Sequence, residues 1–64
     1  DQTLRGYAAW ALGEIRPPGA IYGLEKLRDD INTFTLYDEG KLKKTSVGKI
    51  ASEALAKIRG KREY

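Results

Sequence analysis

Few residue types in this chain of 64 residues are able to do chemistry, and it contains neither cysteine nor histidine. Without histidine it lacks the commonest general base at neutral pH and the commonest metal ligand, and without cysteine it has no disulfides or thiolate sites. The scattered hydroxyl groups have no histidine to activate them. They belong to Thr33, Thr35, Thr45, Ser46 and Ser52. We therefore expect no catalytic residue, no metal and no cofactor, and we do not expect an enzyme.

Two pairs of adjacent acids are the remaining candidates for a metal or acid–base site, Asp29-Asp30 and Asp38-Glu39. Such a site needs convergent carboxylates, whereas side chains adjacent in sequence diverge. We interpret the first pair as the end of a helix and the second as a turn. Gly13, Gly19 and Gly23 are not followed by the Gly-Lys-Ser/Thr of a phosphate loop, so they indicate close helix approach or turn geometry.

Positive charge gathers in the second half of the chain. The net charge is +3, and residues 33–64 hold eight basic and four acidic groups. A candidate basic surface consists of Lys41, Lys43, Lys44 and Lys49, with Lys57, Arg59, Lys61 and Arg62 near the third predicted helix. One hypothesis is a phosphate-facing surface for nucleic acid. The alternative is a solvated face plus charge that complements a helix C-terminus.

Three aromatic residues, Tyr7, Trp10 and Tyr22, are candidates for binding a protein partner, since tyrosine and tryptophan are enriched in interface hot spots. The alternative is ordinary packing against the second helix or against an inserted hairpin. A chain this short has a marginal core and needs its aromatic residues for burial.

The pattern that would position these residues begins with a helix from Leu4 to about Arg16. Its apolar stripe is typical of one helical face, and Asp1 or Thr3 is the expected cap. The stripe consists of Leu4, Ala8, Ala11, Leu12 and Ile15. Pro17-Pro18 ends this helix, because proline lacks the backbone N–H and restricts the residue before it.

A second, shorter helix is predicted from Pro18 or Gly19 to about Ile31, on the stripe Ile21, Leu24, Leu27 and Ile31. Because the connection is only a few residues, we expect the two helices to pack antiparallel as a hairpin.

Residues 33–44 are predicted to form a small hairpin or an extended loop. β-Branched and aromatic residues alternate from Thr33 to Leu36, and Asp38-Glu39-Gly40 is a turn signal. The expected anchors on the helices are Phe34, Leu36 and Leu42. Thr45 or Ser46 then caps a third helix with the stripe Val47, Ile50, Ala51, Ala54, Leu55 and Ile58, and Gly60 is its expected end.

The first and third predicted helices share one apolar skeleton. Leu4 aligns with Val47, Ala8 with Ala51, Leu12 with Leu55 and Ile15 with Ile58. Self-similarity at a period of 20 to 50 residues is the sequence sign of repeat proteins.

Residues 1–30, with the segments Leu4–Ile15, Pro17–Ile21 and Leu24–Asp30, resemble one whole repeat of the short HEAT-like type named after phycobilisome lyases. The resemblance implies an all-α fold, an α-solenoid of helical hairpins, in which residues 1–30 form one full repeat, 31–45 an inserted loop or hairpin, and 46–60 the first helix of a second repeat. It also implies that Asp29 or Asp30 meets the arginine that opens the next repeat. The position matching Arg5 there is Gly48, and Arg5 itself would meet an aspartate of a preceding repeat.

A non-catalytic scaffold or protein–protein interaction module is the function that this architecture implies, with a protein partner or self-association. A nucleic-acid-binding module is one alternative. A non-catalytic part of a subunit like the bilin lyases is another. Because the second repeat is half complete, we expect the chain to be a piece of a longer solenoid. The longest apolar run, Tyr7–Leu12, is too short to span a bilayer, so we expect a cytoplasmic protein without a membrane partner.

Overall fold

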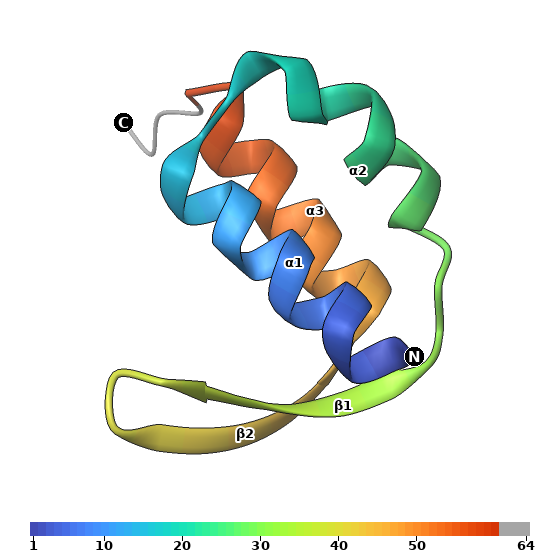
Figure 1. Cartoon of the computed structure of the whole chain (residues 1–64), viewed down its shortest axis with the longest axis vertical. Helices are drawn as coiled ribbons and strands as arrows, with labels where there is room; N and C mark the ends of the chain where they lie inside the picture. The colour runs from blue at the N-terminus through green and yellow to red at the C-terminus, as the bar shows by residue number, and fades with distance from the viewer. Residues whose placement is uncertain (61–64) are drawn as a thin grey trace.

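The computed structural model describes residues 1–60, so Lys61 and Arg62 of the predicted basic group lie outside the described residues. Figure 1 shows the helices stacked over a hairpin that projects beyond them at one end. The elements in chain order are α1 (Gln2–Ile15), the 3-10 turn η1 (Pro18–Ala20), α2 (Ile21–Leu27), β1 (Thr33–Asp38), β2 (Lys41–Ser46) and α3 (Val47–Ile58).

Both ends of α1 follow from its sequence. The Asp1 carboxylate accepts the backbone N–H bonds of Thr3 and Leu4 at 2.7 and 3.2 Å, which satisfies two of the free donors of the first turn. Arg16 adopts a left-handed conformation with φ 62° and donates its N–H to the Leu12 carbonyl, after which the prolines prevent continuation. The predicted first helix is confirmed.

The second helix is shorter than predicted, because α2 ends at Leu27. Asp30 accepts hydrogen bonds from the backbone N–H and the side-chain amide of Asn32, and this local turn replaces further helix. Ile31, predicted to complete the apolar stripe, is 86% exposed.

The hairpin is confirmed, with β1 and β2 antiparallel and Phe34 opposite Thr45. Its turn is formed by Glu39 and Gly40, both with positive φ (54° and 77°), as a two-residue hairpin turn of type I′ requires. Alternation of side chains along β1 buries Phe34 and Leu36 against the helices. The prediction that Leu42 is also an anchor is wrong: it lies opposite Tyr37 on the outer face and is 71% exposed.

Helix α3 is the central element of the core. Ser46 caps it by accepting the N–H of Lys49 at 3.1 Å, and its predicted stripe is buried except for Ile58, which is half-buried. The core consists of Ala9, Leu24, Phe34, Leu36, Val47, Ile50, Ala51, Ala54 and Leu55, five of the nine from α3.

The expected all-α solenoid of helical hairpins is wrong. The fold is a mixed α/β arrangement of three helices and a two-stranded antiparallel sheet, and that sheet supplies Phe34 and Leu36 to the core. Helices α1 and α2 each pack mainly on α3 and at most marginally on each other, so they do not form a paired helical hairpin. The physical reason is that the small inward residues of α1 let α3 and β1 approach closely, so that these two elements and not α2 take most of its inward face.

Those small residues are Gly6, Ala9 and Gly13, which form the buried face of α1. A Cβ atom at Gly6 would lie 2.2 Å from the Phe34 ring, and one at Gly13 would lie 2.9 Å from the backbone of Ala54. The predicted close approach at Gly13 is therefore confirmed, whereas Gly19 and Gly23 have nothing within 4 Å of such a Cβ.

Gly48 explains why the third helix lacks an arginine at the position that matches Arg5. Its N–H donates to the Asp30 carbonyl at 2.8 Å, and a Cβ there would lie 2.4 Å from the Arg28 carbonyl oxygen. The start of α3 thus sits directly on the end of α2. Arg5 instead binds Asp30 of its own chain, Nε to Oδ2 at 2.9 Å, where the resemblance implied an aspartate of a preceding repeat.

Candidate interaction surfaces

Four of the five residues in the predicted apolar stripe of α1 do not face the core, whereas the fifth, Leu12, is half-buried and packs against it. Leu4 is 71% exposed, Ile15 is 73% exposed, Ala8 is exposed and Ala11 is half-buried. Spacings of four, three and four residues put these four side chains on one helical face, and the buried glycines and Ala9 lie on the opposite face. In Figure 1, α1 lies in front of α3 and no other helix or strand covers it from that side.

The residues of α3 that match this stripe differ from it in burial. Val47, Ala51, Ala54 and Leu55 are buried, whereas their counterparts Leu4, Ala8, Ala11 and Leu12 are exposed or half-buried. Within this fold, the stripe of α3 is covered by the small-residue face of α1 and by Leu24 of α2. We call Leu4, Ala8, Ala11 and Ile15 the α1 stripe.

Two charged residues flank the α1 stripe, and each is paired within the chain. Arg5 binds Asp30, and the Glu14 carboxylate binds Lys57 Nζ of α3 at 2.7 Å. The hydrogen bond from Lys57 lowers the pKa of Glu14, so this carboxylate stays ionised below its ordinary range. A protein surface that packs on the α1 stripe therefore meets two flanking charges that are already paired.

Two of the three predicted partner-binding aromatics make contacts inside the fold. Tyr7 is half-buried, stacks edge-to-face on Phe34 with centroids 5.8 Å apart, and accepts the backbone N–H of Tyr37 at 2.9 Å. Trp10 packs against the core cluster and its Nε1 has no hydrogen-bond acceptor within residues 1–60. These are the contacts of the packing alternative, and a binding role for either residue stays a prediction.

Of the three candidate aromatics, Tyr22 is the one that is mostly exposed, at 72%, and it lies on α2. Lys26, one turn later, places its Nζ 4.7 Å from the ring centroid, a cation–π contact on the helix surface.

The four lysines of the predicted basic surface are divided among different faces. Lys41 and Lys43 point to the side of the hairpin that carries Leu36, and Lys44 points to the other side with Leu42, because strand residues alternate. Lys49 lies on α3. Lys41 also stands opposite Asp38 in the strand register, so a carboxylate and not a further lysine is its cross-strand neighbour.

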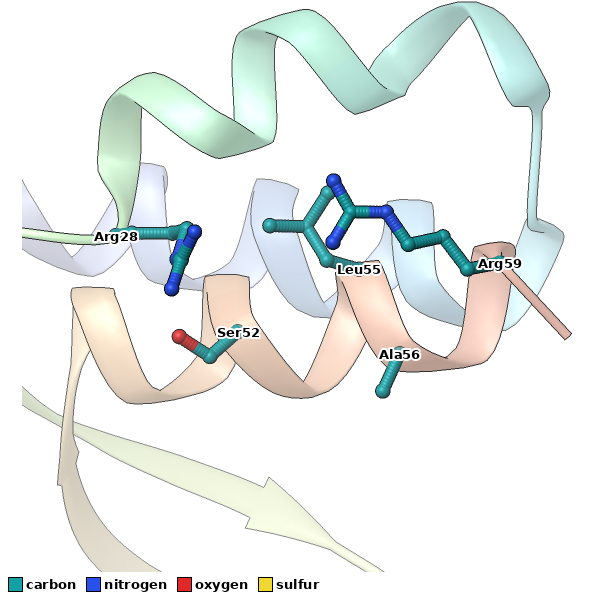
Figure 2. Close-up of a pocket in the computed structure, with 5 residues that line it drawn as sticks. All are labelled: Arg28, Ser52, Leu55, Ala56 and Arg59. Atoms are coloured by element: carbon teal, nitrogen blue, oxygen red, sulfur yellow. The ribbon is translucent and has the colours of Figure 1, made fainter. Parts of the chain in front are cut away.

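A shallow pocket of about 120 Å³ lies between α2 and α3. Figure 2 shows the guanidinium groups of Arg28 and Arg59 on either side of Leu55, with Ser52 and Ala56 completing the lining. Both arginines bind the Glu25 carboxylate, Arg28 Nη1 at 3.0 Å and Arg59 through Nη2. Their hydrogen bonds, that of Arg28 first, lower the pKa of Glu25. This carboxylate links the two helices and occupies the donors that face it.

Within residues 1–60, no group of three or more histidine, cysteine or acidic side chains is arranged to hold a metal ion. None of the helices in that range has the length and apolarity needed to cross a bilayer. No family model, no curated protein and no solved structure matches this chain.

Sequence reasoning found the residues of the α1 stripe but assigned them to the core. The signal that separates the two faces is the size pattern Gly6, Ala9, Gly13 on the opposite side of the same helix. Glycine on a helix face permits the closest packing, so such a face competes well for a neighbouring helix.

Proposed function

We propose that this chain is a non-catalytic protein–protein interaction module that receives a helix on the α1 stripe. The observation that carries the proposal is the alignment of Leu4, Ala8, Ala11 and Ile15 along one exposed helical face. Single exposed apolar residues are ordinary on small proteins, whereas a continuous apolar face indicates an interaction site.

Two features favour docking on the α1 stripe: its flanking charges are paired, and α1 is already held as a helix. Because Arg5 and Glu14 are already paired, a docking helix leaves no unpaired charge to be buried. The cap at Asp1 and the packing of Ala9 against α3 hold α1 as a helix before any partner arrives. Binding then has a low ordering cost. Spacing at i, i+4, i+7 and i+11 is also the pattern by which a helix recognises another helix.

Photo-crosslinking tests this proposal. A benzoylphenylalanine replacing Ala8 is expected to crosslink a specific protein in an extract of the source organism, whereas the same group replacing Lys49, exposed on α3, is not. The crosslinked protein, purified, is then titrated against wild type, Leu4→Lys and the matched variant Leu42→Lys, whose leucine is equally exposed.

Loss of binding in Leu4→Lys with retention in Leu42→Lys is the expected result. Equal labelling from Ala8 and Lys49, or binding that Leu4→Lys leaves unchanged, contradicts the proposal. Because Leu4 is exposed, its substitution is expected to leave thermal stability within a few degrees of wild type, so that lost binding is not lost folding.

A further inference from the structure

We infer that the helix received by the α1 stripe is α1 of a second copy, lying antiparallel across it with Ala8 of one copy against Ala11 of the other. This inference rests on the proposed function and names its partner. It predicts an isologous two-fold dimer, in which the same surface is used by both copies.

The first argument is that the stripe is self-complementary. Its spacings of four, three and four residues read the same in both directions, so reversing the helix returns the pattern onto itself. Two antiparallel copies therefore place Leu4 opposite Ile15 at each end and Ala8 opposite Ala11 in the middle. A two-fold interface requires this symmetry.

The sizes of these residues fit two crossing helices. Alanines at the centre let the axes approach closely where they cross, and Leu4 and Ile15 fill the space at each end, where crossing helices diverge. Ile31, 86% exposed, adds apolar surface at the Leu4 end, because the neighbouring Asp30 is bound to Arg5.

Charge decides the direction of pairing. An antiparallel pair in this register sets Arg5 of each copy at the level of Glu14 of the other, whereas a parallel pair would set Arg5 beside Arg5 and Glu14 beside Glu14. It also sets the two helix dipoles in opposite directions. Arg5 of one copy and Arg5 of the other lie about 13 Å apart along the axis at about 1.5 Å per residue, beyond the screening length in ordinary buffer.

The fold also excludes a second arrangement, in which the α1 stripe of one copy packs on the small-residue face of another. The face that covers an apolar stripe inside the chain consists of Gly6, Ala9 and Gly13, and in every copy α3 already occupies it. The small-residue face of a second copy is therefore not free to cover the stripe, whereas its own α1 stripe is. One helix from each copy is at the low end of interface sizes, so the expected dissociation constant is on the order of 100 μM.

Sedimentation equilibrium of the purified chain from about 10 μM to 1 mM tests the inference. Wild type is expected to shift from monomer to dimer over this range. Leu4→Lys is expected to raise the dissociation constant about 100-fold, because two-fold symmetry counts each substitution twice. Leu42→Lys, on an equally exposed leucine of the hairpin, is expected to change it less than about twofold.

Single cysteines test the orientation, since the natural chain has none. Ala8→Cys mixed with Ala11→Cys is expected to form the mixed disulfide faster than either variant forms its own. A parallel pair would instead favour the disulfide between two Ala8→Cys chains. Circular dichroism of each variant confirms that α1 remains folded.

Three results overturn the inference: a monomer at 1 mM, a dimer that Leu4→Lys does not weaken, or a preference for like disulfides. None of these alone removes the proposed function, because crosslinking of a different protein from Ala8 would keep the α1 stripe as a docking surface with another occupant. If that crosslinking also fails, both proposals fail.

Discussion

Gly48 sets how closely α3 approaches the end of α2. Its backbone N–H reaches the Asp30 carbonyl, while the Arg28 carbonyl lies where a side chain would begin. Both contacts are to backbone, which has little freedom to move away. The absence of a Cβ atom at Gly48 therefore allows the start of α3 to contact the end of α2.

Replacing Gly48 by alanine is expected to destabilise the protein by about 1–3 kcal/mol, because the new Cβ must displace one backbone segment. The matched control is Gly23→Ala within α2, where a Cβ meets nothing within 4 Å. That change is expected to stabilise by about 0.5–1 kcal/mol, since alanine favours helix and restricts the unfolded chain. Urea denaturation measures both, and equal effects at the two glycines would contradict the packing explanation.

At the scale of elements, α2 is tied to α3 by Glu25, which both Arg28 and Arg59 bind. The pKa of Glu25 is lowered from its ordinary value of 4.5 in the folded chain. A lowered folded pKa contributes stability that is complete above the unfolded value and is lost as the pH falls through the folded one.

The free energy of unfolding is therefore expected to be level above about pH 5 and to fall below the ordinary value of 4.5 as Glu25 is protonated. Glu25→Gln is expected to be less stable than wild type at pH 7 and to lose less on acidification. Glu53→Gln is the control, since Glu53 makes no ion pair within residues 1–60. Thermal melts at pH 7, 5, 4 and 3 compare the three proteins. Parallel losses in wild type and Glu25→Gln would assign the acid sensitivity to other groups, such as Asp30, whose pKa is also lowered.

The hairpin is held to the helices by one face of β1. Leu36→Ala is expected to cost about 2–5 kcal/mol because Leu36 is fully buried, whereas Leu42→Ala, on the outer face, is expected to change stability by less than about 0.5 kcal/mol. Chemical denaturation of the two variants provides the comparison. A similar cost at both leucines would mean that the hairpin buries both of its faces.

Local signals in the sequence were sufficient for most element boundaries. Prolines after α1, the serine before α3 and the glycine in the hairpin turn act within a few residues, so they are readable without tertiary structure. The inward face of α1 was not readable in this way, because two apolar faces of unequal size share that helix. Periodicity selects the face with larger side chains, whereas packing selected the face with glycine at Gly6 and Gly13.

The candidate site was predictable in its residues and not in its role. Leu4, Ala8, Ala11 and Ile15 stood out as a stripe, but assigning them to solvent required knowledge that α3 takes the other face. The pairing of Arg28 and Arg59 on Glu25 joins residues of different helices, and no sequence spacing indicates it.

At the scale of the whole molecule, the hairpin supplies side chains to the core, although its two ends lie next to each other as in a separate loop. Val47 donates its N–H to the Asn32 carbonyl at 2.9 Å, so residues 33–46 leave and re-enter the helical part at one point. A short glycine linker is therefore long enough to replace them.

We expect that replacement to abolish cooperative unfolding, because it removes Phe34, Leu36 and the Ser46 cap of α3. Differential scanning calorimetry and near-ultraviolet circular dichroism, which reports on Trp10, follow the outcome. A linker variant that melts cooperatively near the wild-type temperature would show that the helices form an independent unit. The control is Glu39→Asn, which makes the turn Asn-Gly, another good two-residue turn, and it is expected to leave the transition intact.

The central position of α3 has a consequence for synthesis on the ribosome. Five of the nine core residues belong to this helix, which follows α1, α2 and the hairpin in the chain. Until it leaves the exit tunnel, α1 and β1 can contact each other through Tyr7 and Phe34, but α1 and α2 lack the helix on which both mainly pack. We therefore expect the core to form only after α3 has been translated, and the preceding elements to be sensitive to protease until then.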